Sequence, residues 1–269
     1  MAQAPAVSTF ERVAHEAARR AGAVLRARYR DRLEVTHKGA VDLVTAVDRE
    51  AEHLILEVLS SAFPDHAIVA EESGVRAGTS SYRWYVDPID GTTNFAHGFP
   101  HFAVSIALED AHGLLLGVVF DPIREEMFSA TRAEGARLNG SPIRVSPTAR
   151  IADALLATGF PYDRRSRSKF YLAFIEAALQ HSQGIRCVGS AALDLCWVAC
   201  GRVDAYWEWN LHAWDTAAGE LIIAEAGGRV TGFSGQAHRP GDAETAASNG
   251  HLHQEMLAVI SGVQDDIRS

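Results

Sequence analysis

Apolar residues recur at helical spacing near the start of the chain. Over residues 8–29 they return every three or four positions, with arginines on the opposite side, which predicts an amphipathic helix. Residues 48–61 carry a second such stripe. Asp48 lies near its start, where a carboxylate interacts favourably with the helix dipole, and Pro64 ends it. Strands are then predicted at residues 67–70 and 83–87, followed by an antiparallel meander within 102–144 whose strands are 102–108, 114–120 and 126–131.

After Arg150 the pattern changes to short apolar strands that alternate with helices. Gly201 and Gly227 stand at positions typical of helix C-termini. This alternation predicts an α/β fold of mixed layers, with an N-terminal α+β lobe (1–150), a C-terminal α/β lobe (151–269) and no flexible linker between them. The later strands are expected at residues 154–158, 185–188, 203–207 and 229–231, and the later helices at 170–181, 190–200, 214–226 and 253–263.

The segment VDPIDGTTNF, residues 86–95, carries the clearest chemical signal. Asp87 leaves the end of a buried strand, and Asp90 follows after a turn stiffened by proline. Their carboxylates and the carbonyl of Ile89 can converge on a hard cation, which prefers oxygen ligands. The alternative is that Asp-Pro and Asp-Gly only form turns.

The same segment can also bind an anion. Gly91 allows a tight bend, and Thr92 opens a short predicted helix. The N–H groups of these two residues would then face a phosphate.

Three further acidic segments fit the same site. Glu71 follows a predicted strand, where it can also be a solvated edge residue. Asp215 lies at a predicted helix start, where its alternative role is an N-cap. Asp42 and Asp48 flank an apolar run, and capping or turn formation is again the plain alternative.

These segments, in this order, resemble the inositol monophosphatase family of lithium-sensitive, magnesium-dependent phosphatases. The resemblance rests on Glu71 before a serine, on residues 87–95 and on WDTAAG at 214–219. It covers nearly the whole chain and looks closest to the bacterial branch of the family. Further matching segments are GFP at 98–100, LNG at 138–140, ATGFP at 157–161 and GSAALDL at 189–195.

The resemblance implies a layered αβαβα sandwich of the inositol monophosphatase and fructose bisphosphatase type, usually a homodimer, with two or three Mg²⁺ between the lobes. It also implies a role for each matching residue. Asp48 and Thr92 form a hydrogen-bonded pair that, with Glu71, orients and deprotonates the attacking water. The metal ligands would be Glu71, Asp87, Asp90, Asp215 and the carbonyl of Ile89. The substrate would contact Asp90, Gly91, Thr92, Gly189, Ser190, Ala191 and Glu208, with Glu208 accepting hydrogen bonds from ring hydroxyls.

Composition limits the partners. The 269 residues carry a net charge of −9, which disfavours electrostatic binding to nucleic acid or an anionic membrane. The three cysteines, Cys187, Cys196 and Cys200, give no disulfide framework. We therefore expect a reducing, cytoplasmic location. Neither a secretory signal nor an apolar run of ~20 residues is visible.

Several alternatives stay open at this point. The substrate could instead be fructose 1,6-bisphosphate, histidinol phosphate or phosphoadenosine phosphate, with the basic run 163–170 and Arg186 holding a second phosphate. The plain interpretation of that run is a solvated, charged loop before a helix, and Glu208 favours a polyol because it would repel a second anion. Some bacterial relatives also associate with the transcription machinery. Lys38 could belong to a mobile metal-binding loop, and His212 could support a metal ligand or be structural.

Overall fold

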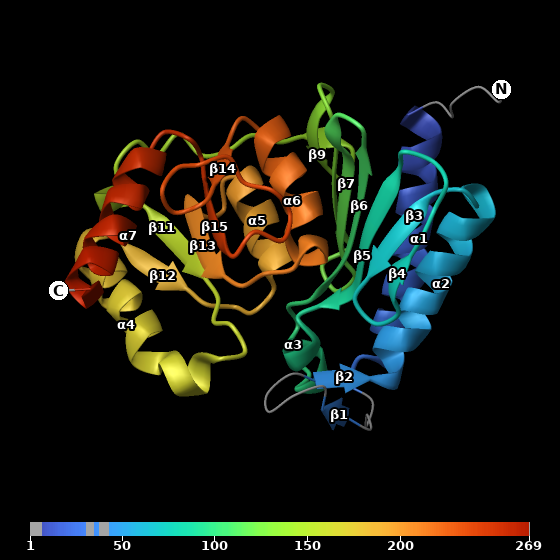
Figure 1. The fold of residues 1–269 in the computed structure, drawn as a ribbon, viewed down its shortest axis with the longest axis horizontal. Coiled ribbons are helices and arrows are strands. Elements are labelled where there is room, and N and C mark those ends of the chain that lie inside the picture. Colours follow the sequence, from blue (N-terminus) through green and yellow to red (C-terminus); the bar gives the residue numbers. More distant parts are fainter. Residues whose placement is uncertain (1–6, 31–34, 38–42, 269) are drawn as a thin grey trace.

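The computed structural model describes residues 7–30, 35–37 and 43–268. Their helices and strands form five layers, in which helices and sheets alternate (Figure 1). Three clusters of buried side chains fill the spaces between these layers. The predicted αβαβα sandwich is confirmed.

The first two layers come from the N-terminal half. Helices α1 (Val7–Arg28) and α2 (Ala46–Ala62) cover one face of an eight-stranded sheet with the order β10-β9-β8-β7-β6-β5-β3-β4. Its strands are β3 (Ala67–Ala70), β4 (Gly74–Arg76), β5 (Arg83–Asp90), β6 (Ala103–Asp110), β7 (Gly113–Asp121), β8 (Glu126–Thr131), β9 (Gly135–Leu138) and β10 (Ser141–Pro142). A separate hairpin pairs β1 (Val35–His37) with β2 (Leu43–Thr45).

Strand β6 shows why helices cover both faces of this sheet. Val104 and Ile106 point into the core beneath α1 and α2, whereas Ala103 and Ala107 point into the core on the opposite side. Successive side chains of a strand alternate between faces, and the first six residues of β6 are all buried, so both faces of the sheet are covered there.

The last three layers come from the C-terminal half. Helices α5 (Ala191–Ala199) and α6 (Ala213–Glu225) lie between the two sheets, and α4 (Arg164–His181) and α7 (His253–Arg268) cover the outer face of the second sheet (Figure 1). That five-stranded sheet has the order β12-β11-β13-β15-β14. Its strands are β11 (Leu155–Thr158), β12 (Gly184–Arg186), β13 (Ala205–Trp209), β14 (Arg229–Thr231) and β15 (Glu244–Ser248), and a 3₁₀ turn, η1 (Ile151–Asp153), precedes them.

Two glycines allow α6 to pack closely. A Cβ at Gly117 on β7 would lie 2.6 Å from the carbonyl oxygen of Ala218, and a Cβ at Gly219 would lie 2.6 Å from Cβ of Leu195 on α5. Both distances are too short for real side chains. The absence of a side chain at Gly117 therefore lets α6, and with it Asp215, lie close to the first sheet, and its absence at Gly219 lets α6 lie close to α5.

Most of the predicted elements are present within a few residues of their predicted ends. One expectation was wrong, and some strands, such as β4 and β15, were not predicted. Residues 164–169 belong to α4, which has a kink at Arg167. The carbonyl of Asp163 accepts the backbone N–H groups of Ser166 and Arg167 and so starts the helix early. Strand β15 was not predicted, because its sequence ETAAS contains no β-branched aliphatic or aromatic residue. The strands of the eight-stranded sheet all precede residue 150 in the sequence, and those of the five-stranded sheet all follow it. The division of the chain into two lobes stays a prediction.

No helix among the described residues is both long and apolar enough to span a membrane.

Candidate active site

A cavity of about 250 Å³ opens where β5, α3 (Thr92–Ala96), α6 and β13 meet. It is formed by segments that are far apart in the sequence, from Glu71 to Asp215. Every residue for which the resemblance implies a metal or substrate contact lines this cavity: Glu71, Asp87, Ile89, Asp90, Gly91, Thr92, Gly189, Ser190, Ala191, Glu208 and Asp215.

Three carboxylates gather on one side of the cavity. Asp87 and Asp90 from the end of β5 and Asp215 from the first turn of α6 each place an oxygen within 4.8 Å of the other two. Burial raises the pKa of Asp87 well above its usual value, and the adjacent charges of Glu71 and Asp90 raise it further. Burial also raises the pKa of Asp90 to about 7, together with the charge of Asp215. These carboxylates repel one another when charged, and either a proton or a bound cation would relieve that repulsion.

The composition of the cluster fits a hard divalent cation. All its side-chain donors are carboxylate oxygens, and Glu71 adds a fourth carboxylate through its hydrogen bond to Asp87. The carbonyl of Ile89 lies between the two aspartates in sequence. Thr92 Oγ1 lies 2.9 Å from this carbonyl oxygen and 3.0 Å from Asp48 Oδ1, so its single hydrogen can be donated to only one of the two at a time. An all-oxygen set of this kind suits Mg²⁺ or Ca²⁺ rather than a softer metal.

The turn after β5 brings the start of α3 to the same cavity as this cluster. Gly91 has φ 96° and ψ 36°, a left-handed conformation that only glycine adopts without strain. A Cβ there would also lie 3.0 Å from the carbonyl oxygen of His101. The turn leads into α3, whose first N–H groups have no partner within the helix, and Gly91 and Thr92 both line the cavity.

Thr92 contacts Asp48 inside the protein. Its Oγ1 lies 3.0 Å from Asp48 Oδ1, and both side chains are buried. Asp48 is the third residue of α2 and does not line the cavity itself, so the Thr92 hydroxyl connects this carboxylate with the cavity.

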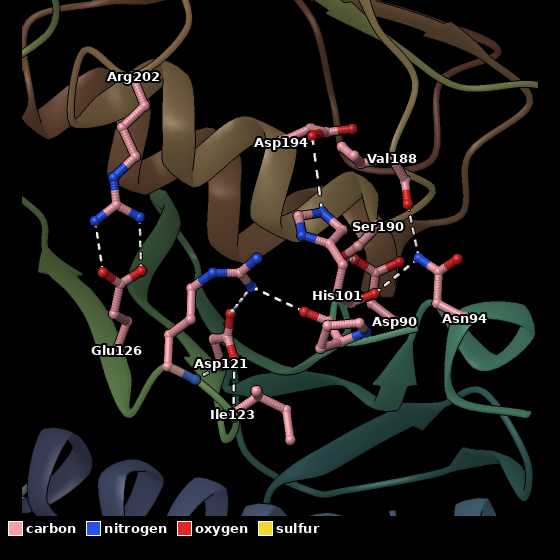
Figure 2. Close-up of polar contacts among 12 residues, drawn as sticks. Asp90, Asn94, His101, Asp121, Ile123, Glu126, Val188, Ser190, Asp194 and Arg202 are labelled. Atoms are coloured by element: carbon pink, nitrogen blue, oxygen red, sulfur yellow. Dashed lines mark hydrogen bonds and ion pairs between the residues drawn. The ribbon is translucent and has the colours of Figure 1, made fainter. Parts of the chain in front are cut away.

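Asp90 links the first sheet to α5. Its Oδ2 accepts a hydrogen bond from Ser190 Oγ at 2.5 Å (Figure 2). The same oxygen accepts one from the backbone N–H of Ala192 at 2.7 Å, at the start of α5. Asn94 makes a parallel connection, donating from Nδ2 to the carbonyls of Val188 at 2.7 Å and His101 at 2.8 Å. The sequence reasoning gave Asn94 no role, although it lies within the DGTTNF segment.

Glu208, on β13, also lines the cavity. It is buried, and burial raises its pKa to about 8, although the Tyr206 hydroxyl donates a hydrogen bond to the carboxylate and lowers it. Arg164, the first residue of α4, also lines the cavity, and its charge lowers the pKa of Glu208. The early start of α4 thus brings one residue of the predicted basic run to the site.

His212 precedes α6 and contacts a residue of the acidic cluster. Its backbone N–H donates to Asp215 Oδ2 at 2.7 Å, and its ring stacks on Trp214 at 4.7 Å between centroids. The N-cap of α6 is therefore His212, and the prediction that Asp215 itself could be the N-cap is wrong. Asp215 is the N3 residue of a capping box, and it joins the acidic cluster as well. Two other residues considered in the sequence, Lys38 and Asp42, lie outside the described residues.

Comparison with known proteins agrees with this geometry. A model of the inositol monophosphatase family matches residues 6–265. Nus factor SuhB from Pasteurella multocida (strain Pm70) is 46% identical over 259 residues, which are 95% of this chain and 94% of that protein. The crystal structure of extragenic suppressor protein suhB from Bartonella henselae has a TM-score of 0.89 at 40% identity, covering 93% of this chain and 98% of its own. The structure of inositol monophosphatase from Anabaena (Nostoc) sp. PCC 7120 has a TM-score of 0.86 at 40% identity, covering 95% of this chain and 96% of its own.

The layered fold and the family match place the chain among phosphatases. It belongs to the inositol monophosphatase family, as the resemblance of its motifs implied.

Proposed function

We propose that the protein is a magnesium-dependent phosphomonoester hydrolase that converts inositol monophosphate and water to inositol and phosphate. One observation carries the proposal. A cluster of carboxylates suited to a divalent cation, the N-terminal turn of α3 and the buried carboxylate of Glu208 all line a single cavity.

The acidic residues would hold the cation. Asp87, Asp90 and Asp215 contribute carboxylate oxygens, with Glu71 and the Ile89 carbonyl beside them. When bound, Mg²⁺ lowers the pKa of water and offsets negative charge on the phosphoryl and leaving oxygens. Asp90 is held by Ser190 and Ala192 through Oδ2, which leaves Oδ1 for the cation.

Thr92 and Asp48 would handle the proton of the attacking water. When the Thr92 hydroxyl donates its hydrogen to Asp48, its lone pairs can accept a hydrogen bond from water in the cavity. Glu71, on the same side of the cavity, is the second acceptor for that water. Because water is the nucleophile, no phosphorylated residue is required.

The remaining groups would bind the substrate. The N–H groups of Gly91 and Thr92 face the phosphate, and Glu208 accepts hydrogen bonds from ring hydroxyls, with Gly189, Ser190 and Ala191 forming the wall between them. The predicted preference for a polyol is supported by the charge of the cavity. Among the described lining residues, Arg164 is the one lysine or arginine, whereas five carry carboxylates.

A phosphate-release assay tests this function. Enzyme stripped with EDTA should be inactive and should recover full activity with added Mg²⁺. Inositol monophosphates should be hydrolysed with a higher kcat/KM than fructose 1,6-bisphosphate, histidinol phosphate or phosphoadenosine phosphate. Full activity in cation-free enzyme would disprove the mechanism. A higher kcat/KM for one of the other phosphates would make that compound the proposed substrate instead of inositol monophosphate.

A second function is favoured by the relatives. The chain is 46% identical over 95% of its length to a protein named Nus factor SuhB. We therefore propose contact with the transcription machinery beside catalysis, through a protein surface rather than nucleic acid. Retention of purified RNA polymerase by the immobilised protein would support this role. Retention combined with no phosphatase activity on any of the substrates above would make it the main function.

A further inference from the structure

Two residues contact the carboxylate of Glu208, one that does not line the cavity and one that does. The first is Tyr206, two residues earlier on β13. Alternate residues of a strand point to the same face, so both side chains lie on the side of the sheet that faces α5. Tyr206 is fully buried, and its hydroxyl donates a hydrogen bond to Glu208 Oε2.

The second is Gly159, the residue directly after β11. A Cβ at this position would overlap the carboxylate of Glu208, with Oε1 only 2.5 Å away. The space that glycine leaves free is therefore occupied by the carboxylate. Gly159 has no left-handed backbone conformation that would otherwise require glycine.

We propose that Tyr206 and Gly159 are positioning residues that fix the Glu208 carboxylate against the end of β11, and that they thereby determine selectivity for polyol phosphates. The inference rests on the proposed contact between Glu208 and the ring hydroxyls. Glutamate has three side-chain torsions, and burial costs its charged form free energy. The hydrogen bond from Tyr206 offsets part of that cost. The missing side chain at Gly159 leaves space in which the carboxylate of Glu208 fits.

The consequence is a division of labour within one cavity. The acidic cluster and the turn at Gly91 act on the phosphate of every substrate. The carboxylate of Glu208 acts only on substrates with hydroxyls near the phosphate. Loss of either positioning residue should therefore weaken binding of inositol 1-phosphate and leave a simple aryl phosphate unaffected.

Tyr206→Phe tests the first half. The ring stays in the core and only the donor is lost. KM for inositol 1-phosphate should rise about 3- to 10-fold, the range expected for one hydrogen bond, with kcat within twofold. Both constants for p-nitrophenyl phosphate should stay within twofold. Tyr85→Phe is the matched control, because Tyr85 donates to Glu109 at 2.8 Å outside the cavity, and it should leave both substrates unchanged.

Gly159→Ala tests the second half without removing a polar group. The obstructed atoms are at the end of a side chain, so the carboxylate should move and the fold should persist. We expect the same selective rise in KM. In a Glu208→Ala background the added methyl group has room, and Gly159→Ala should have no further effect. This non-additivity is the sign that both residues act through Glu208.

Glu208→Gln separates the possible failures. If it does not selectively weaken hydrolysis of inositol 1-phosphate, the polyol contact itself is wrong and the inference falls with it. If Glu208→Gln is selective but Tyr206→Phe and Gly159→Ala behave like the wild type, the positioning role alone is overturned. Equal losses on both substrates in these two variants would also overturn it, since they indicate a general structural defect.

Discussion

Asp215 combines two tasks in a single side chain. Its Oδ2 accepts the backbone N–H of His212 at the start of α6, and the same carboxylate belongs to the acidic cluster. The two tasks differ chemically, because a helix cap needs only an acceptor oxygen, whereas a cation site needs negative charge. A substitution that keeps the oxygen and removes the charge therefore separates them.

Asp215→Asn should lower kcat/KM at least ~100-fold, which corresponds to roughly 3 kcal/mol, because a cation ligand loses its charge. The amide oxygen can still accept from His212, and one repulsive charge is gone. The thermal unfolding temperature without cations should therefore not fall. Asp242→Asn is the control, since Asp242 accepts the backbone N–H of Arg239 at 2.9 Å in an exposed loop. The kcat/KM of this variant should stay within twofold of the wild-type value. Near-normal activity of Asp215→Asn would show that Asp215 serves only to cap the helix.

The roles of some single residues could be predicted from the sequence, and those of others could not. Asp87, Asp90 and Gly91 are close together in the chain, so one short segment already indicates a cation site beside a phosphate turn. The proposed roles of Gly159 and Tyr206 depend on their contacts with Glu208, which the sequence does not show. Glycine after a strand and tyrosine within a strand are common, and no local pattern distinguishes these two from residues that only pack.

Among the elements, α6 is the one whose position decides whether the site exists. It lies between the two sheets and presents Asp215 to the aspartates of β5. Its helical pattern was clear from the sequence, and its ends are close to those predicted. Its distance from β7 was not predictable, because that distance depends on Gly117, a strand residue with no signal of its own until its neighbour Ala218 is known.

Gly117→Ala should therefore destabilise the protein. The new methyl group would lie 2.6 Å from the backbone oxygen of Ala218, which cannot turn away as a side chain can. Overpacking of this kind costs about 1–3 kcal/mol, or several degrees in unfolding temperature by calorimetry. Gly262→Ala in α7 is the control. Space around Gly262 is open, so alanine should stabilise its helix by up to about 1 kcal/mol. Equal unfolding temperatures for Gly117→Ala and the wild type would show that α6 has freedom to move.

In the whole molecule, the site draws on both sheets. Asp87 and Asp90 belong to the first sheet, Glu208 to the second, and Asp215 to the helix layer between them. Predicting the elements and the acidic residues was possible, because each has a local pattern. Their convergence could be inferred only from the family resemblance, since it depends on how two sheets pack around α5 and α6.

The same convergence makes stability depend on pH. A carboxyl group whose pKa is raised by folding binds its proton more tightly in the folded chain. Its contribution is complete below about pH 4 and is lost as the pH rises through the folded value, which is about 7 for Asp90 and about 8 for Glu208. Buried histidines act in the opposite direction, because burial lowers the pKa of His101 and His253 to about 4. Their contribution grows between pH 4 and 6.5 and is constant above that range.

Between pH 6.5 and 8 the carboxyl groups therefore dominate, and the cation-free protein should unfold at a lower temperature as the pH rises. Added Mg²⁺ binds the deprotonated cluster and stabilises the folded state by mass action. The increase in unfolding temperature at a fixed Mg²⁺ concentration should thus be several degrees larger at pH 8 than at pH 6.5. Scanning calorimetry of EDTA-treated enzyme with and without Mg²⁺ measures both trends. Asp215→Asn should flatten the cation-free trend, because it removes a charge that raises the pKa of Asp90. A cation-free protein that becomes more stable toward pH 8 would show that these carboxylates already have a positive partner inside the protein.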